Sequence, residues 1–232
     1  MNERVHFLHL GKTGGSAIKD ALEPLASSGS YDVRLHEHSV RLKDLPRGEP
    51  FFFAVRDPVS RFVSGFTSRQ NQGLPRYDRP WSPSEAVAFR RFATANELGE
   101  AIGSDDRELR QAARSAMSDI QHVRNSYWSW FGSERRFRRS SGRILCILFQ
   151  ERLAEDFAEL VRLLGLEHLE PRLPDDPVRA HRSATDVDRS LSPPAVANLQ
   201  RWYEKDYEFV ELCRRLDPRP TSVGPPTTVP GG

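Results

Sequence analysis

Short runs of apolar residues alternate along this chain with longer segments in which apolar residues recur at helical spacing. The runs Val5–Leu10, Phe51–Arg56 and Ile144–Gln150 predict buried strands, and Tyr31–His36 predicts a weaker one. Alternation of this kind is typical of an α/β fold, in which helices flank a central sheet of mainly parallel strands. We therefore predict that architecture.

Helices are predicted between and after these strands. The expected helical segments are Ser16–Leu25, Leu153–Leu166 and a last long helix from about Pro193 to Leu216. Another helix is expected after the strand at 51–56, because Asp57 is suited to cap it and Pro58 to occupy its first turn. Residues 72–143 carry no strand signal, so short helices and loops are expected there.

The length of the chain, 232 residues, fits one domain with a full core. We predict that this domain covers residues 1–216. Pro and Gly predominate from residue 217 onward, which predicts a disordered tail over 217–232.

Charge and cysteine content limit the classes of partner. Lys and Arg number 34 against 32 Asp and Glu, a formal charge of +2, which gives no bulk electrostatic argument for a nucleic acid or membrane partner. Cys146 lies in an apolar run and Cys213 on an apolar helical face, so both are predicted to be buried thiols of a reducing compartment. The N-terminal apolar run is too short for a signal peptide or membrane span. We therefore expect a cytoplasmic protein without nucleic acid partners or stable membrane insertion.

A glycine-rich turn, "GKTGGS" at residues 11–16, follows the first predicted strand and precedes a predicted helix. The N–H groups of such a turn and the positive end of the helix point to one place, which suits a phosphate. Glycine allows close approach of the backbone, Lys12 adds a mobile charge, and the hydroxyls of Thr13 and Ser16 add donors. The alternative is a tight strand-to-helix turn with a solvated lysine.

This turn does not match the P-loop of nucleotide triphosphatases. The first glycine of G-x-x-x-x-G-K-[ST] would fall at His6, within the predicted strand. The strand at 51–56 also ends in Arg56, where a triphosphate-hydrolysing enzyme usually holds magnesium with a carboxylate. A cation there predicts a second anion site, which Ser64, about two helical turns further on, is placed to share. Alternatively, Arg56 pairs with a carboxylate of the fold.

The two stretches "HLGKTGGSAIKDAL" and "FFFAVRDPVSRFVSGF" together resemble the cofactor-binding motifs of the PAPS-dependent sulfotransferases. PAPS is 3′-phosphoadenosine 5′-phosphosulfate, and the similarity is to the branch of the Golgi carbohydrate sulfotransferases, such as the heparan-type 2-O-sulfotransferases, and their bacterial relatives. Weaker similarity of "ILFQERLAEDFAELVRLLGL" and "LSPPAVANLQRWYEKDY" extends it over most of the chain outside residues 72–143 and the tail. The resemblance implies a P-loop-like three-layer α/β fold, PAPS as the sulfuryl donor, PAP as its product and no metal.

The resemblance also implies roles for individual residues. The first family motif, usually P-K-T-G-G-[TS], implies that the 5′-phosphosulfate is held by Gly11, Lys12, Thr13, Gly14, Gly15 and Ser16. The second, R-D-P-x-x-R-x-x-S, implies that Arg56 and Ser64 hold the 3′-phosphate. "AHRSATD" stands where the family often has a loop that closes over that phosphate, which adds Arg182 and Ser183. Gly11 replaces the usual proline; it restores backbone freedom and adds an N–H, so affinity could change in either direction.

Transfer to a hydroxyl needs a base for the acceptor's proton, and near neutral pH a histidine is suited to this. "LHEHSV" supplies His36 and His38 after the weaker strand, at the sheet edge where α/β proteins bind ligands. If the strand continues, both histidines share a face and Glu37 points away. An H-x-H pair contributes the base in the heparan-type 2-O-sulfotransferases, so His38 is the predicted base, with His36 orienting it or contacting the acceptor. Glu37, or an acid from the middle region, is the alternative base, and His122 receives no role.

The predicted function is direct, in-line transfer of the sulfuryl group of PAPS to a hydroxyl, with Lys12 neutralising charge on the leaving phosphate. A nucleotide kinase or other phosphoryl transferase, or a nucleotide-binding module without turnover, are the alternatives. A carbohydrate is the acceptor that the resemblance favours, although a lipid, a phenol or a polyketide stays open. Residues 72–143 are expected on the acceptor side, where three residues (Trp81, Trp128 and Trp130) suit a sugar. The arginines of "RRFRRSSGR" at 135–143 suit an anionic acceptor, or else form a solvated loop.

Overall fold

The structure is a computed structural model that describes residues 3–75, 77–174 and 190–217. Its strands are β1 (Glu3–Leu8), β2 (Tyr31–Leu35), β3 (Phe51–Val55) and β4 (Ile144–Phe149). Its α-helices are α1 (Gly15–Leu22), α2 (Pro58–Gln70), α3 (Pro83–Arg91), α4 (Ala95–Ala101), α5 (Arg107–Asp119), α6 (Trp128–Phe131), α7 (Glu134–Arg139), α8 (Leu153–Leu163), α9 (Pro193–Trp202) and α10 (Glu204–Leu216). Short 3-10 helices are η1 (Glu23–Leu25), η2 (Leu42–Asp44), η3 (Ser141–Arg143), η4 (Gln150–Arg152) and η5 (Glu167–Leu169). Arg182, Ser183 and residues 218–232 of the predicted tail lie outside the described residues.

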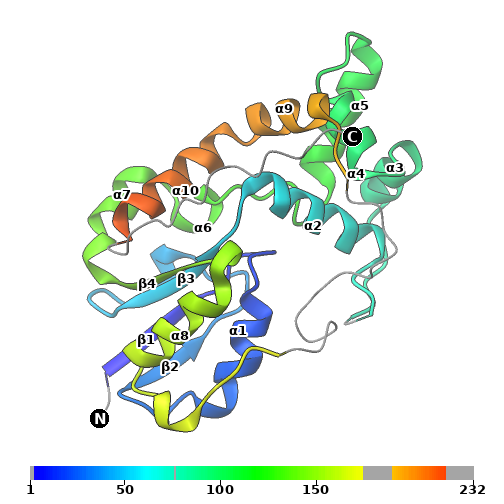
Figure 1. Cartoon of the computed structure of the whole chain (residues 1–232). Coiled ribbons are helices and arrows are strands. Elements are labelled where there is room, and N and C mark those ends of the chain that lie inside the picture. Colours follow the sequence, from blue (N-terminus) through cyan, green and yellow to red (C-terminus); the bar gives the residue numbers. More distant parts are fainter. Residues whose placement is uncertain (1–2, 76, 175–189, 218–232) are drawn as a thin grey trace, which may run out of the picture.

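The strands form a parallel sheet in the order β2-β1-β3-β4 (Figure 1). In its centre Phe7 of β1 pairs with Phe52 of β3, which in turn pairs with Cys146 of β4. Every residue of β3 is buried, as expected for a parallel strand covered on both faces. The predicted α/β fold with a mainly parallel sheet is thereby confirmed.

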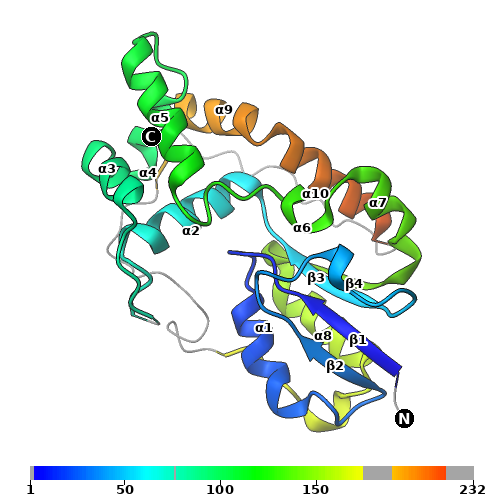
Figure 2. The ribbon, with the colours of Figure 1, turned by 180° about the vertical axis from the view of Figure 1, so that it is seen from behind.

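Alternating side chains of β3 build two cores, one on each face of the sheet. Phe52 and Ala54 belong to the core under α1 and α8. Phe51 and Phe53 belong to an aromatic core on the opposite face, where the facing aromatic residues are Tyr127, Phe131, Phe137 and Phe209. Figure 2 shows the second face from behind, with α6, α7 and α10 over the sheet. Helices on both faces of the sheet give the three predicted layers.

A third core lies beyond the ends of the strands and joins the helices of the middle region to α2 and α9. It includes Phe62 and Phe66 of α2, Leu98 of α4 and Leu199 of α9. The short helices predicted within residues 72–143 are α3 to α7. α2 therefore connects the sheet to this helical part, and its first turn lies where the two meet (Figure 1).

The single long helix predicted over residues 193–216 is wrong, because the chain breaks between α9 and α10 at Tyr203. The buried Tyr203 hydroxyl donates a hydrogen bond to the carbonyl oxygen of Val123 at 2.9 Å. Beyond the break, the buried carboxylate of Asp206 accepts a hydrogen bond from Arg61 of α2 at 2.8 Å. These contacts redirect the chain, although its apolar periodicity continues across the break.

Cys146 and Cys213 are both buried, as predicted, and neither forms a disulfide bond within the described residues. Across the described residues, the helices lack the length and apolar character that a bilayer span requires.

Candidate active site

The glycine-rich turn joins the end of β1 to α1, and Gly14 is the N-cap of that helix. Lys12 and Gly14 both have left-handed backbone, with φ of 68° and 86°. Glycine adopts this conformation freely, whereas a lysine there is unusual. Because the first N–H groups of a helix have no acceptor within it, the turn presents several donors beside the Lys12 side chain. Lys12, Gly14, Gly15 and Ser16 line one cleft.

The glycines of the turn differ in how much space surrounds them. A Cβ added at Gly15 would lie 2.3 Å from Cδ2 of His9, so any side chain there would displace the imidazole. A Cβ at Gly11 would approach no closer than 3.5 Å, to Nδ1 of His122, which is ordinary contact. Position 15 therefore requires glycine, whereas position 11 has room for a side chain.

Thr13 has a different place from the one predicted. Its side chain is buried, and its hydroxyl donates to the carbonyl oxygen of Leu10 at 3.0 Å. This hydrogen bond closes the turn internally. The predicted use of the Thr13 hydroxyl as a phosphate donor is therefore corrected, because its proton is bound to the Leu10 carbonyl and Thr13 is not among the residues that line the cleft.

Lys12 carries its charge in an unfavourable environment. Burial, followed by repulsion from Arg56, lowers the pKa of its ammonium group to about 8. Within the described part of the chain no carboxylate forms an ion pair with it, and a buried ammonium without a counter-ion is costly. An anion bound between Lys12 and Arg56 would remove both penalties.

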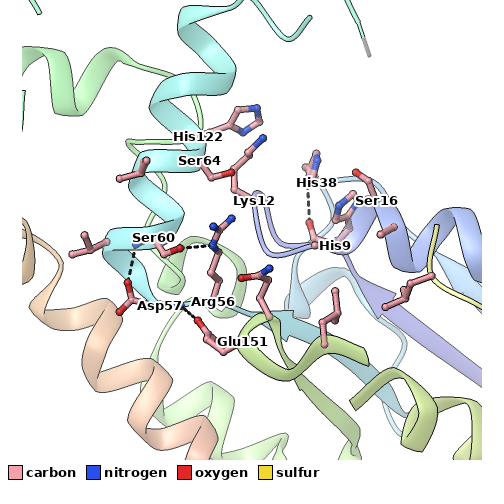
Figure 3. Close-up of a pocket in the computed structure, with 18 of the residues that line it drawn as sticks. His9, Lys12, Ser16, His38, Arg56, Asp57, Ser60, Ser64, His122 and Glu151 are labelled. Carbon is pink, nitrogen blue, oxygen red and sulfur yellow. Dashed lines mark hydrogen bonds between the residues drawn. The ribbon is translucent and has the colours of Figure 1, made fainter. Parts of the chain in front are cut away.

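Arg56 is the first residue after β3, and its Nε donates to the Ser60 hydroxyl at 2.8 Å (Figure 3). Asp57 caps α2 as predicted, because its carboxylate accepts the Ser60 N–H at 2.7 Å. Ser64 lies one turn further along the same helix and lines the same cleft. The end of β3 and the first two turns of α2 thus bring together the two residues predicted for the second anion site.

His38 reaches the cleft from the loop after β2 (Figure 3). Its Nδ1 lies 2.9 Å from the carbonyl oxygen of His9. A carbonyl only accepts, so Nδ1 carries the proton and Nε2 keeps a basic lone pair. Burial lowers the pKa of His38, and the hydrogen bond to His9 opposes this only in part. The His38 imidazole is therefore neutral at neutral pH, with Nε2 unprotonated.

The predicted common face for His36 and His38 is wrong, because β2 ends at Leu35. Nε2 of His36 lies 2.9 Å from Nδ1 of His6, and the two rings stack with centroids 5.1 Å apart. His36 is thus held against β1 and is not among the residues that line the cleft. The structure brings His38 together with Lys12 and Arg56 and leaves His36 apart from them.

Glu37, the alternative base, also lies outside the cleft lining. Its carboxylate accepts a hydrogen bond from Lys19 of α1, which lowers its pKa. The chain turns directly after it, where the Val40 N–H donates to the Glu37 carbonyl at 3.1 Å. This turn, absent from the strand-based prediction, directs His38 inward and Glu37 outward.

Residues 2–211 match the model of the family described as the sulfotransferase family. The chain belongs to the sulfotransferase family. This confirms the PAPS-dependent sulfotransferase predicted from the two motifs.

Among solved structures this sulfotransferase is similar to mouse sulfotransferase SULT7A1 complexed with PAP, with 14% sequence identity, coverage of 92% of this chain and 87% of that chain, and a TM-score of 0.49. No match was found among curated proteins.

Several residues that line or support the sulfotransferase cleft have no counterpart in the sequence predictions. Ser60 holds the Arg56 side chain, and Tyr127 binds the Arg56 backbone. His122, which received no role, lines the cleft, and burial followed by the charge of Lys12 lowers its pKa to about 3. Ser60 lies within the second motif and could have been found there. Tyr127 and His122 belong to no motif, and only the fold brings them to the site.

The aromatic and basic residues predicted for the acceptor do not line this cleft. The indole N–H groups of the three tryptophans donate to backbone carbonyls, namely Trp81 to Arg69, Trp128 to Lys205 and Trp130 to His38. The arginine-rich α7 precedes the start of β4, whereas the glycine-rich turn and Arg56 follow the ends of β1 and β3. In a parallel sheet the starts and the ends of the strands lie at opposite ends of the sheet. The arginine cluster therefore lies away from the site. Arg143 at its end donates to the carbonyls of Pro46 and Glu49.

Across residues 3–75, 77–174 and 190–217, no group of three or more His, Cys, Asp or Glu side chains is arranged to hold a metal ion.

Proposed function

We propose that this sulfotransferase transfers the sulfuryl group of PAPS to a hydroxyl of a carbohydrate or glycoconjugate by direct in-line transfer, with His38 as the general base. The observation that carries the proposal is the hydrogen bond from His38 Nδ1 to the His9 carbonyl, which leaves Nε2 basic in a cleft that also contains Lys12 and Arg56. Fixing the tautomer of a histidine through its other ring nitrogen is the usual way to orient a base.

The residues of the cleft fit the two anionic ends of the donor. Lys12, with the N–H groups at the start of α1 and the Ser16 hydroxyl, would hold the 5′-phosphosulfate. The burial of Lys12 and the repulsion from Arg56, which lower its pKa, support an anion at this place. Arg56 and Ser64 would hold the 3′-phosphate, and Ser60 fixes the guanidinium for this task. Gly11 and Thr13 would shape the turn. When bound, PAPS supplies an activated sulfuryl group on its 5′-phosphate.

His38 would act on the acceptor. Its Nε2 would take the proton of the attacking hydroxyl, and the resulting imidazolium would keep its Nδ1–H on the His9 carbonyl. Lys12 and the turn N–H groups would stabilise the negative charge that develops on the leaving phosphate. The base and the cation are thus placed for the two ends of a displacement without a covalent enzyme intermediate.

Ligand binding tests the donor site. PAP should raise the melting temperature, whereas AMP, which lacks the 3′-phosphate, should do much less. Arg56→Ala should weaken PAP binding by about 1.5–3 kcal/mol, the value of a charge-assisted hydrogen bond. Arg135→Ala on the exposed face of α7 is the control and should leave PAP binding unchanged. Equal stabilisation by PAP and AMP would contradict the assignment of Arg56 and Ser64.

Turnover separates an enzyme from a binding module. Incubation with ³⁵S-labelled PAPS and sugar acceptors should give a labelled product that is lost in His38→Ala, while PAP binding remains. Binding without transfer to any hydroxyl compound would favour the nucleotide-binding module.

A further inference from the structure

One wall of the cleft is formed by residues outside both family motifs. Tyr77 and Arg79 come from the loop after α2, and Gln121 and His122 come from the segment after α5. Lys12 and His38 line the same cleft, and the ring centroids of His122 and His38 are 6.2 Å apart. This wall therefore borders the place where the proposed donor and base meet.

His122 is held in an unusual conformation. Its φ is 70°, in the left-handed region that costs energy for a residue with a side chain. Lys12, with φ of 68°, is a second residue of this kind in the same cleft. α2 approaches His122 closely, because a Cβ added at Gly65 would lie 3.2 Å from Cβ of His122. A strained backbone that is fixed by its neighbours and directed into a cleft is a common feature of functional residues.

A buried ion pair anchors the segment that carries His122. The guanidinium of Arg69 donates two hydrogen bonds of 2.8 Å to the carboxylate of Glu85, and both side chains are buried. The same carboxylate accepts the backbone N–H of Gln121 at 3.1 Å. Arg69 also donates to the carbonyl oxygen of Arg79 at 3.1 Å. One ion pair thus fixes both segments that form this wall.

The wall has hydrogen-bonding groups on His122 and Arg79, beside the aromatic ring of Tyr77. The His122 and His38 ring centroids are 6.2 Å apart, and Nε2 of His122 lies 3.5 Å from the Tyr77 hydroxyl. His122 stays neutral, since burial and the charge of Lys12 lower its pKa, so it has one donor and one acceptor nitrogen. Arg79 is exposed at the rim, and within the described residues its guanidinium forms no ion pair. An apolar acceptor would displace water from these polar groups without replacing its hydrogen bonds.

We propose that His122, Tyr77 and Gln121 form the acceptor subsite and that Arg79 adds a contact for an anionic group, so that the acceptor is an acidic sugar. The proposal rests on the proposed sulfuryl transfer. His122 would hold the reacting hydroxyl or its neighbour beside Nε2 of His38, and the Tyr77 ring would face the sugar ring. Arg79 would bind a carboxylate or sulfate group on the sugar.

Two variants test the subsite without disturbing the fold. His122→Gly removes the imidazole and suits a positive φ, so the protein should keep its melting temperature. Arg79→Gln removes an exposed charge. The assay uses ³⁵S-labelled PAPS with uronic-acid-containing disaccharides, their neutral glucose counterparts, simple phenols and long-chain alcohols. PAP binding is measured separately for each variant.

We expect the wild-type protein to label the acidic disaccharides in preference to the other probes. His122→Gly should raise the KM of the disaccharide about tenfold or more, the loss of a hydrogen bond or two, with PAP affinity nearly unchanged. Arg79→Gln should raise the KM of the acidic disaccharide but not that of the neutral one. Labelling of phenols or alcohols instead, no labelling of sugars while PAP binds, or unchanged KM values in His122→Gly would overturn the subsite. Failure of the wild-type protein to bind PAP would instead overturn the proposed function.

Discussion

The hydroxyl of Tyr127 makes two hydrogen bonds to the backbone of Arg56: it accepts the Arg56 N–H at 3.0 Å and donates to the Arg56 carbonyl at 2.7 Å. The two residues are 71 positions apart in the chain. Tyr127 is fully buried, and the guanidinium of Arg61 lies 4.5 Å above its ring. The end of β3, from which Arg56 enters the cleft, is therefore fixed by a side chain at the start of α6.

Removal of this hydroxyl should weaken the site for the 3′-phosphate. In Tyr127→Phe the ring remains, but the Arg56 N–H and carbonyl lose their partner, so PAP affinity should fall by about 1–2 kcal/mol. AMP affinity should change much less. Tyr203→Phe is a matched control, because its buried hydroxyl donates to Val123 away from the cleft. Isothermal titration with PAP and AMP measures the effect, and an equal loss for both nucleotides would mean that Tyr127 acts only on stability.

The two ends of the glycine-rich turn should respond differently to the same substitution. Gly15→Ala would place its Cβ 2.3 Å from the His9 ring, whereas the nearest atom to a Cβ at Gly11 would be 3.5 Å away. Gly15→Ala should therefore displace His9, whose carbonyl orients His38, and lower both stability and kcat. Gly11→Ala should leave both nearly unchanged. Melting temperatures and kcat of the two variants test this; equal behaviour would contradict the packing at the turn.

Binding of PAP should depend on pH through Lys12. Its pKa is about 8 without a ligand, so as pH rises through 8 the ammonium loses its proton and the affinity for an anion falls. Bound phosphate favours the charged form, so binding near pH 8 should take up a proton. Calorimetry in buffers with different ionisation enthalpies measures this uptake. Lys12→Met should abolish the uptake and weaken binding. Affinity that stays constant from pH 7 to 9 would show that Lys12 does not contact the anion.

Local chemistry allowed much of the fold to be predicted from the sequence. Asp57 and Pro58 identify the start of α2 because capping depends on a few adjacent residues. The break at Tyr203 was missed because it depends on contacts with Val123 and α2, which periodicity does not record.

In the site too, residues with a local sequence signal were predicted, and residues placed by long-range contacts were not. Lys12 and Arg56 could be selected because turn and strand-end chemistry is local. His36 was placed wrongly because the end of β2 depends on how the chain packs against β1 and α1, including the His36–His6 and Glu37–Lys19 contacts. His122 lacks any local signal, since its place in the cleft is set by the buried Glu85 beneath its segment.

His38 should be essential for turnover and not for donor binding. Loss of a positioned general base typically costs about two to four orders of magnitude in kcat, which is the effect expected of His38→Ala. PAP affinity should stay nearly unchanged, because Lys12 and Arg56 lie on other segments. His36→Ala is the neighbouring control, and it should cost much less because His36 packs against His6 outside the cleft.

The pH profile of kcat/KM for wild type, His38→Ala and His36→Ala tests the role of His38 most directly. Only neutral His38 accepts a proton, so activity should fall as pH decreases through its pKa, and burial places that acidic limb below the usual histidine value of 6.5. The account predicts that His36→Ala keeps the limb and that the residual activity of His38→Ala has lost it. Near-normal turnover of His38→Ala with the acidic limb retained would contradict the assignment of His38 as the base.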